Sequence, residues 1–300
     1  MKRISGRTSW RALRYSMLVC LMPALTSGVS FAQPTAASPL DGCGELVTIE
    51  THDRTTTRYG FAPEPDAPDR GARTLLVLLV GGGGQLDLDD AGCPHSLTRN
   101  SLIRMRPHFH DAGFMTALVD APSDFHGEDG LAGFRTATQH AEDLGKVIAQ
   151  LRRRTNGPIW LVGHSRGTIS AANAAARLSG PSTPDGLVLL SAMMVGDAAK
   201  RKPFVAQTVF DPPLESIAVP LLILGHAADS CVRSPVGLMA KVAARTHGPR
   251  QQAVVVAGGP VNPGRAPSIA VCGVGEPHDF VGQDAEIAAG ILRFIGGGRY

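Results

Sequence analysis

The segment Gly163-His164-Ser165-Arg166-Gly167 places a serine where it can act as a nucleophile. An apolar run over residues 159–162 precedes it and an alanine-rich stretch over residues 168–178 follows it, a pattern that indicates a strand, a sharp turn and a helix. Such a turn lifts a serine hydroxyl clear of the sheet and needs small residues two positions away on either side. Gly163 and Gly167 meet this need, so Ser165 is the predicted nucleophile.

A nucleophilic serine needs a neighbouring base to take its proton, and the base needs an acid to orient it. Downstream of Ser165, a buried-strand pattern over residues 219–224 opens into the loop that contains Asp229. His278 lies in a later loop, before an amphipathic helix with apolar residues on one face. We therefore expect His278 to act as base and then acid, and Asp229 to hold its imidazole.

Each of these two assignments has alternatives. Asp229 could also be an ordinary turn residue. In that case Asp197, Asp211 and Asp279 are the other candidates for the acid. His278 also fits a solvent-facing loop, and its nearest rival is His226, which lies only three residues from Asp229. The favoured residues are those that fall at strand ends in the order serine, acid, histidine.

This order and the Gly-x-Ser-x-Gly turn resemble the α/β-hydrolase superfamily over roughly residues 73–298. The resemblance implies an α/β fold, with a mostly parallel central sheet and helices on both faces. It also implies two backbone N–H donors to the oxyanion, one from Arg166 and one from the loop Gly81–Gly84. It favours Gly82, but Val80 stands where lipase-type sequences often have histidine, so the choice between Gly82 and Gly83 stays open.

The remaining chain reads as one large α/β domain. Apolar strands are expected at 74–80, 114–119 and 186–190, alternating with helices near 100–111 and 136–153. The segment from Ser191 to Val219 suits a small flap and is too short for a large cap domain. The expected division is a signal peptide at 1–32, an N-terminal extension with a short hairpin at 33–72, and the hydrolase domain at 73–300.

The first 32 residues read as a secretory signal peptide. They contain five basic residues and no acid, then an apolar stretch and the small-residue site Ser30-Phe31-Ala32. Cleavage after Ala32 predicts a periplasmic or extracellular protein; an uncleaved membrane anchor is the alternative. The leader takes five of the 29 basic residues, which leaves 24 against 26 acidic ones. We therefore expect neither nucleic-acid binding nor stable membrane insertion after cleavage.

Four cysteines follow the leader: Cys43, Cys93, Cys231 and Cys272. An even number in an exported chain indicates disulfides, and four cysteines allow three pairings. The expected fold favours Cys43 with Cys93 and Cys231 with Cys272, while free buried thiols are the alternative. The second bridge would tie the loops of Asp229 and His278 together.

Two other chemistries are set aside. The segment His108-Phe109-His110-Asp111 suggests a metal, but residues two apart on a helix point away from each other. The glycine loop lacks the Gly-Lys-Ser/Thr ending of a phosphate-binding loop. The favoured function is hydrolysis of a small carboxylic ester through an acyl-enzyme, without metal or cofactor. The alternatives are amide, thioester or carbon-carbon bond cleavage by the same residues, or a non-catalytic binding scaffold.

Overall fold

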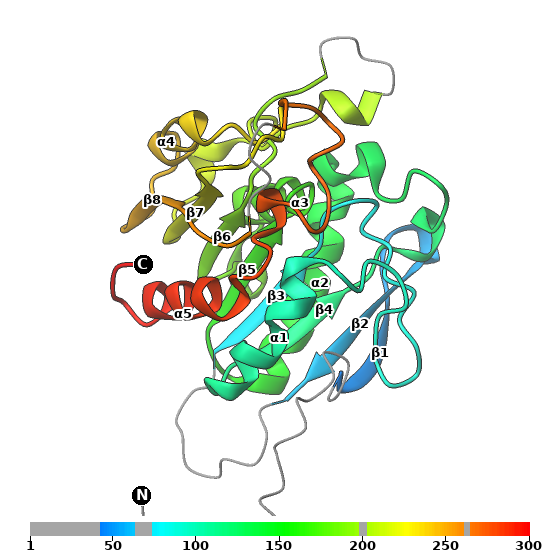
Figure 1. The fold of residues 1–300 in the computed structure, drawn as a ribbon. Helices are drawn as coiled ribbons and strands as arrows, with labels where there is room; N and C mark the ends of the chain where they lie inside the picture. Colours follow the sequence, from blue (N-terminus) through cyan, green and yellow to red (C-terminus); the bar gives the residue numbers. More distant parts are fainter. Residues whose placement is uncertain (1–42, 64–73, 198–202, 261–264) are drawn as a thin grey trace, which may run out of the picture. The chain divides into compact units, whose positions relative to one another are not determined.

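The computed structural model describes residues 43–63, 74–197, 203–260 and 265–300 (Figure 1). The predicted signal peptide and most of the predicted connector between Phe61 and Arg70 lie outside these residues. None of the described helices combines the length and the apolar composition needed to cross a membrane.

Within the described residues, eight strands form one sheet in the order β1-β2-β4-β3-β5-β6-β7-β8. The strands from β4 to β8 in this order are parallel, whereas β2 pairs antiparallel with β1 and β4. Their bounds are β1 Glu45–Glu50, β2 Thr56–Ala62, β3 Leu75–Leu79, β4 Met115–Val119, β5 Ile159–His164, β6 Gly186–Leu190, β7 Leu221–His226 and β8 Gln251–Val256.

Helices cover both faces of this sheet, as expected (Figure 1). Helices α2, α3 and α4 contribute side chains to the core on one face, and α1 and α5 to the core on the other. Their bounds are α1 Ser101–Asp111, α2 Thr138–Thr155, α3 Gly167–Arg177, α4 Met239–Ala244 and α5 Asp284–Ile295.

The central strand β3 shows why these residues form a doubly covered sheet. Successive strand side chains point to opposite faces, so Leu75, Val77 and Leu79 enter the core beneath α2 and α3. Leu76 and Leu78 enter the core beneath α1 and α5. All five are buried, and burial of each such side chain contributes about 1.5–3 kcal/mol. An uninterrupted apolar run is therefore the signature of a strand covered on both sides.

The structure adds elements to the sequence prediction. The expected hairpin is β1 and β2, and it extends the main sheet because β2 pairs with β4. Strand β8 and helix α4 were not predicted, although the run of β-branched residues at Val254–Val256 favours a strand. Between β6 and β7 the described residues form only single-turn helices, Pro203–Ala206 and Leu214–Ser216. This agrees with a small flap in place of a cap domain.

Candidate active site

Ser165 lies at the turn between β5 and α3, where the backbone is strained. Its φ of 53° lies in the left-handed region that residues other than glycine rarely adopt. A Cβ atom on Gly163 would lie 2.7 Å from the carbonyl oxygen of Gly167, and one on Gly167 would lie 2.0 Å from that of Leu79. Only glycine fits at both positions, so the spacing of the motif follows from close backbone packing.

The side chains of Ser165, His278 and Asp229 form a continuous chain of hydrogen bonds. His278 Nε2 lies 3.0 Å from Ser165 Oγ, and His278 Nδ1 lies 2.9 Å from Asp229 Oδ2. Ser165 follows β5, Asp229 follows β7, and His278 lies in the turn Pro277–Asp279 beyond β8. With Nδ1–H donating to the carboxylate, Nε2 is left to accept the serine proton.

Asp229 is held by two further donors. The N–H of Cys231 donates to Asp229 Oδ1 at 2.8 Å, and the hydroxyl of Ser234 donates to Asp229 Oδ2 at 2.7 Å. Ser234 Oγ also lies 3.0 Å from His278 Nδ1. Sequence analysis missed Ser234 because no motif marks it; its role depends on the path of the loop after β7.

Two disulfides join the four cysteines in the pairing that sequence analysis favoured. Cys231 is bonded to Cys272, and Cys43, just before β1, is bonded to Cys93 in the long loop after β3. The first bridge links the loop of Asp229 to the segment that leads to His278. It therefore restrains the two loops that bring Asp229 and His278 together.

Buried polar side chains hold the main chain at His278 through hydrogen bonds. Its carbonyl oxygen accepts hydrogen bonds from the Ser191 hydroxyl at 2.7 Å and from His164 Nε2–H at 3.1 Å. Burial lowers the pKa of His164 to about 4, so this ring is neutral near pH 7. Its other nitrogen, Nδ1, accepts from the side-chain amide of Asn100 at 3.0 Å. His164 and Asn100 were not predicted as contributors.

The rival acid and base are engaged elsewhere. Asp279 accepts the N–H of Ser101 at 2.9 Å and Arg104 Nη1 at 2.5 Å, which fastens the His278 turn to the start of α1. His226 donates from Nε2 to the carbonyl of Gly258 and accepts at Nδ1 from the N–H of Ala228.

The two remaining substitutes for the acid lie in the segment between β6 and β7. Asp211 Oδ2 accepts the N–H of Thr208, and the N–H of Asp197 donates to Val205 O. Among the described side chains, only Asp229 and Ser234 bond Nδ1 of His278.

Ser165 opens into a cavity of about 280 Å³, and Gly82 and Arg166 line it beside the serine. Gly82 has a φ of +57°, which favours glycine. Gly83 is turned toward the neighbouring segment, where its carbonyl accepts the N–H of Leu131 at 2.8 Å. Of the two candidate oxyanion donors in this loop, Gly82 is therefore the one that borders the cavity.

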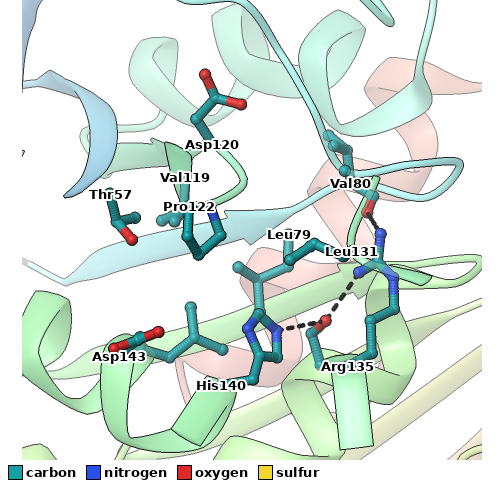
Figure 2. Close-up of a pocket in the computed structure, with 13 residues that line it drawn as sticks. Thr57, Leu79, Val80, Val119, Asp120, Pro122, Leu131, Arg135, His140 and Asp143 are labelled. Carbon is teal, nitrogen blue, oxygen red and sulfur yellow. Dashed lines mark hydrogen bonds between the residues drawn. The ribbon is translucent and has the colours of Figure 1, made fainter. Parts of the chain in front are cut away.

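A buried arginine that sequence analysis missed lines a second, smaller pocket (Figure 2). Arg135 is 1% exposed and donates to the carbonyl of Gly82 at 3.2 Å and to Ser170 Oγ at 2.8 Å. Ser170 Oγ lies 2.9 Å from His140 Nε2. The adjoining cavity, at about 20 Å³, has room for one water molecule and is too small for a substrate. Arg135 therefore holds the glycine loop from a second cavity, which Ser165 does not line.

The described residues offer one cluster with metal-ligand atoms in reach of one another: Asp229, Cys231 and His278. The sulfur of Cys231 is in a disulfide, so it cannot serve as a thiolate ligand. At the other segment considered for metal, His110 Nε2 lies 2.8 Å from the hydroxyl of Thr116. The cluster at Asp229 therefore keeps two possible ligand side chains, Asp229 and His278.

No protein-family model matches this sequence, and a search of curated proteins returned no match. Solved structures do match. A soluble variant of monoglyceride lipase from Saccharomyces cerevisiae is 12% identical, with a TM-score of 0.59 over 89% of this chain and 100% of that one. Esterase 2 from Thermogutta terrifontis is 16% identical, with a TM-score of 0.55 over 87% and 97%. An alpha-beta serine hydrolase homologue from Coxiella burnetii is 16% identical, with a TM-score of 0.51 over 84% and 97%. At these identities the likeness establishes the fold: the chain has the α/β-hydrolase fold.

Proposed function

We propose that this protein is a serine hydrolase that cleaves carboxylic esters, with Ser165 as nucleophile, His278 as base and acid, and Asp229 as the acid that orients His278. The observation that supports this most directly is the unbroken run of short contacts from Asp229 Oδ2 through both imidazole nitrogens to Ser165 Oγ. The names of the similar structures, an esterase and a monoglyceride lipase, support an ester as the bond cleaved.

In the first half of the proposed reaction, Ser165 Oγ bonds to the ester carbonyl carbon while its proton moves to His278 Nε2. The negative oxygen of the tetrahedral intermediate accepts from the N–H groups of Arg166 and Gly82. Loss of one such donor typically costs about 3–4 kcal/mol in the barrier. The alcohol then leaves with the proton from Nε2, and the acyl group stays on Ser165.

In the second half, water attacks the acyl-enzyme and gives its proton to His278 Nε2. The intermediate collapses, Ser165 recovers its proton from the same nitrogen, and the carboxylic acid is released. Asp229 stays ionised throughout and stabilises the imidazolium that forms twice per cycle. No metal or cofactor takes part in these steps.

The test is steady-state hydrolysis of a chain-length series of nitrophenyl esters. Ser165→Ala and His278→Ala should lose at least about 10⁴-fold in kcat, and Asp229→Asn less, with circular dichroism unchanged. A fluorophosphonate should label the native protein and leave Ser165→Ala unlabelled. Ester turnover by Ser165→Ala at the native rate would refute the mechanism, and labelling without turnover would favour a binding scaffold.

We also propose that the protein is exported after cleavage behind Ala32. The two disulfides support this because such bonds persist in oxidising compartments. Expression of the full chain in a bacterial host, followed by fractionation and N-terminal sequencing, should give a periplasmic or secreted product that begins at Gln33. An intact N-terminus in the membrane fraction would identify the leader as an anchor.

A further inference from the structure

The cavity at Ser165 combines an apolar wall with two guanidinium groups. Its apolar lining is Met193, Val205, Ile269 and Cys272. Arg166 and Arg233 also line it, and no aspartate or glutamate is among its described lining residues. An ester with a plain alkyl chain would need only the apolar wall. The two cations therefore call for a separate explanation.

Arg233 is fixed in place without losing its charge. It is 8% exposed, and its Nε and Nη2 donate to the backbone carbonyls of Val195 and Gln207, the second at 3.3 Å. These acceptors hold the side chain but carry no formal charge. Asp197 acts on it through space, yet burial outweighs that attraction and lowers the pKa of Arg233. The side chain is thus a preorganised cation at the cavity wall.

The positive charge continues around the nucleophile. Burial is the largest cause that lowers the pKa of Arg166, and repulsion from Arg233 is the second. Attraction to Asp129 raises this pKa but does not cancel the two. The pKa of Arg135, next to the glycine loop, is lowered mainly by burial and secondly by repulsion from Arg166. Arg166 and Arg233 both line the cavity, and none of its described lining residues is acidic. A ligand in the cavity therefore meets two cations, which attract an anionic group.

We propose that the physiological substrate is a short ester that carries a carboxylate, which Arg166 and Arg233 recognise. A guanidinium forms paired hydrogen bonds with a planar carboxylate, and such bonds are stronger than those between neutral groups. The volume of about 280 Å³ is near the lower end of the range for ligand pockets, roughly 300–1,000 Å³, and limits the substrate to a short chain. This proposal rests on the proposed ester hydrolysis.

The test compares charged esters with neutral partners of the same shape. Monoethyl glutarate against ethyl glutaramate places the carboxylate on the acyl side, and 4-acetoxybenzoate against 4-acetoxybenzamide places it on the alcohol side. In at least one pair, the native enzyme should prefer the charged ester by roughly tenfold or more in kcat/KM. The pair that shows the preference identifies the side of the ester that enters the cavity.

Arg233→Met and Arg166→Met should each lower this preference about tenfold, because methionine keeps the apolar stem and removes the charge. Arg233→Lys should retain part of it. The control is Arg245→Met, which removes a cation from an exposed pair with Glu215 outside the cavity, and should keep the native preference. A purely structural role of Arg233 would lower the rates of both esters equally and leave their ratio unchanged.

The proposal is overturned if the native enzyme shows no preference in either pair, or if the preference survives both methionine substitutions. Calorimetric titration with glutarate and with glutaramate gives a readout that does not need turnover. Glutarate should bind more tightly to the native protein, and Arg233→Met should abolish the difference. If no ester is cleaved and Ser165 resists fluorophosphonate, ester hydrolysis fails as the function. The titration then decides the anion site separately.

Discussion

The bridge between Cys231 and Cys272 should matter for catalysis as well as for stability. Cys231 is 2% exposed, and its N–H holds Asp229 Oδ1 at 2.8 Å. Cys272 lines the cavity and precedes His278 by six residues. The informative perturbation is the double variant Cys231→Ala/Cys272→Ala, which keeps the backbone N–H of residue 231 but removes the covalent restraint between the two loops.

The other disulfide supplies a matched control. The two bridges close loops with sequence separations of 41 and 50 residues, and in the chain-entropy model each contributes about 4 kcal/mol at 25 °C. For a domain of this size each kcal/mol shifts the midpoint of unfolding by roughly 2–4 °C. Either double alanine variant should therefore lower Tm by roughly 8–16 °C. Neither Cys43 nor Cys93 lines the cavity, so their removal should change stability alone.

Scanning calorimetry at pH 7 measures the two Tm values, and saturation kinetics on a nitrophenyl ester are then run well below both. We expect Cys231→Ala/Cys272→Ala to lose about tenfold or more in kcat, since misplacement of a catalytic group by about 1 Å costs up to 10²-fold. Cys43→Ala/Cys93→Ala should keep nearly the native kcat. Equal kcat in the two variants, at equal loss of Tm, would show that the bridge does not position the acid and base.

Three smaller predictions concern single buried groups. Arg135→Lys should lower kcat about tenfold with little change in KM, because one ammonium cannot hold both the Gly82 carbonyl and Ser170. An unchanged kcat would show that Arg135 is not needed to support the glycine loop. Ser234→Ala should lower kcat roughly fivefold, the equivalent of one hydrogen bond, in the same ester assay, and native turnover would make this hydroxyl dispensable. Burial lowers the pKa of His140 to about 3, below its unfolded value near 6.5, so its contribution to stability is complete above pH 6.5 and is lost as the pH falls toward 3. Urea titrations measure the unfolding free energy at pH 7 and at pH 4.5. Between these pH values the free energy should fall by about 3 kcal/mol less in His140→Gln than in the native protein. An equal fall in both proteins would contradict a neutral buried imidazole.

Local signals were sufficient to predict the turn at Ser165 and most of the sheet. The glycines flanking Ser165 are required by backbone contacts within a few residues and by one neighbouring strand, so their spacing is visible in any such sequence. Strands such as β3 and β7 are covered on both faces and therefore appear as uninterrupted apolar runs. Strand β8, at the edge, alternates between exposed and partly buried residues and gave a weaker signal.

Local sequence signals could not predict the residues that support the candidate site. Asn100 reaches His164 across 64 residues, and Ser234 reaches His278 across 44. Arg135 lies in a single-turn helix, Ala132–Thr136, that no motif marks, yet it is buried next to the glycine loop. Contacts between distant segments depend on side-chain direction and loop path, which periodicity and spacing do not specify.

The choice among rival residues shows most clearly what sequence and tertiary structure each contribute. The sequence by itself determined the class of fold and the candidates Ser165, Asp229 and His278, because hydrophobic burial and steric limits at a turn act over short stretches of chain. It left four aspartates and two histidines as alternatives. Only the tertiary structure decided that Asp229 contacts His278 while Asp279 is paired with Arg104, because hydrogen bonding depends on distance and direction between groups that folding brings together.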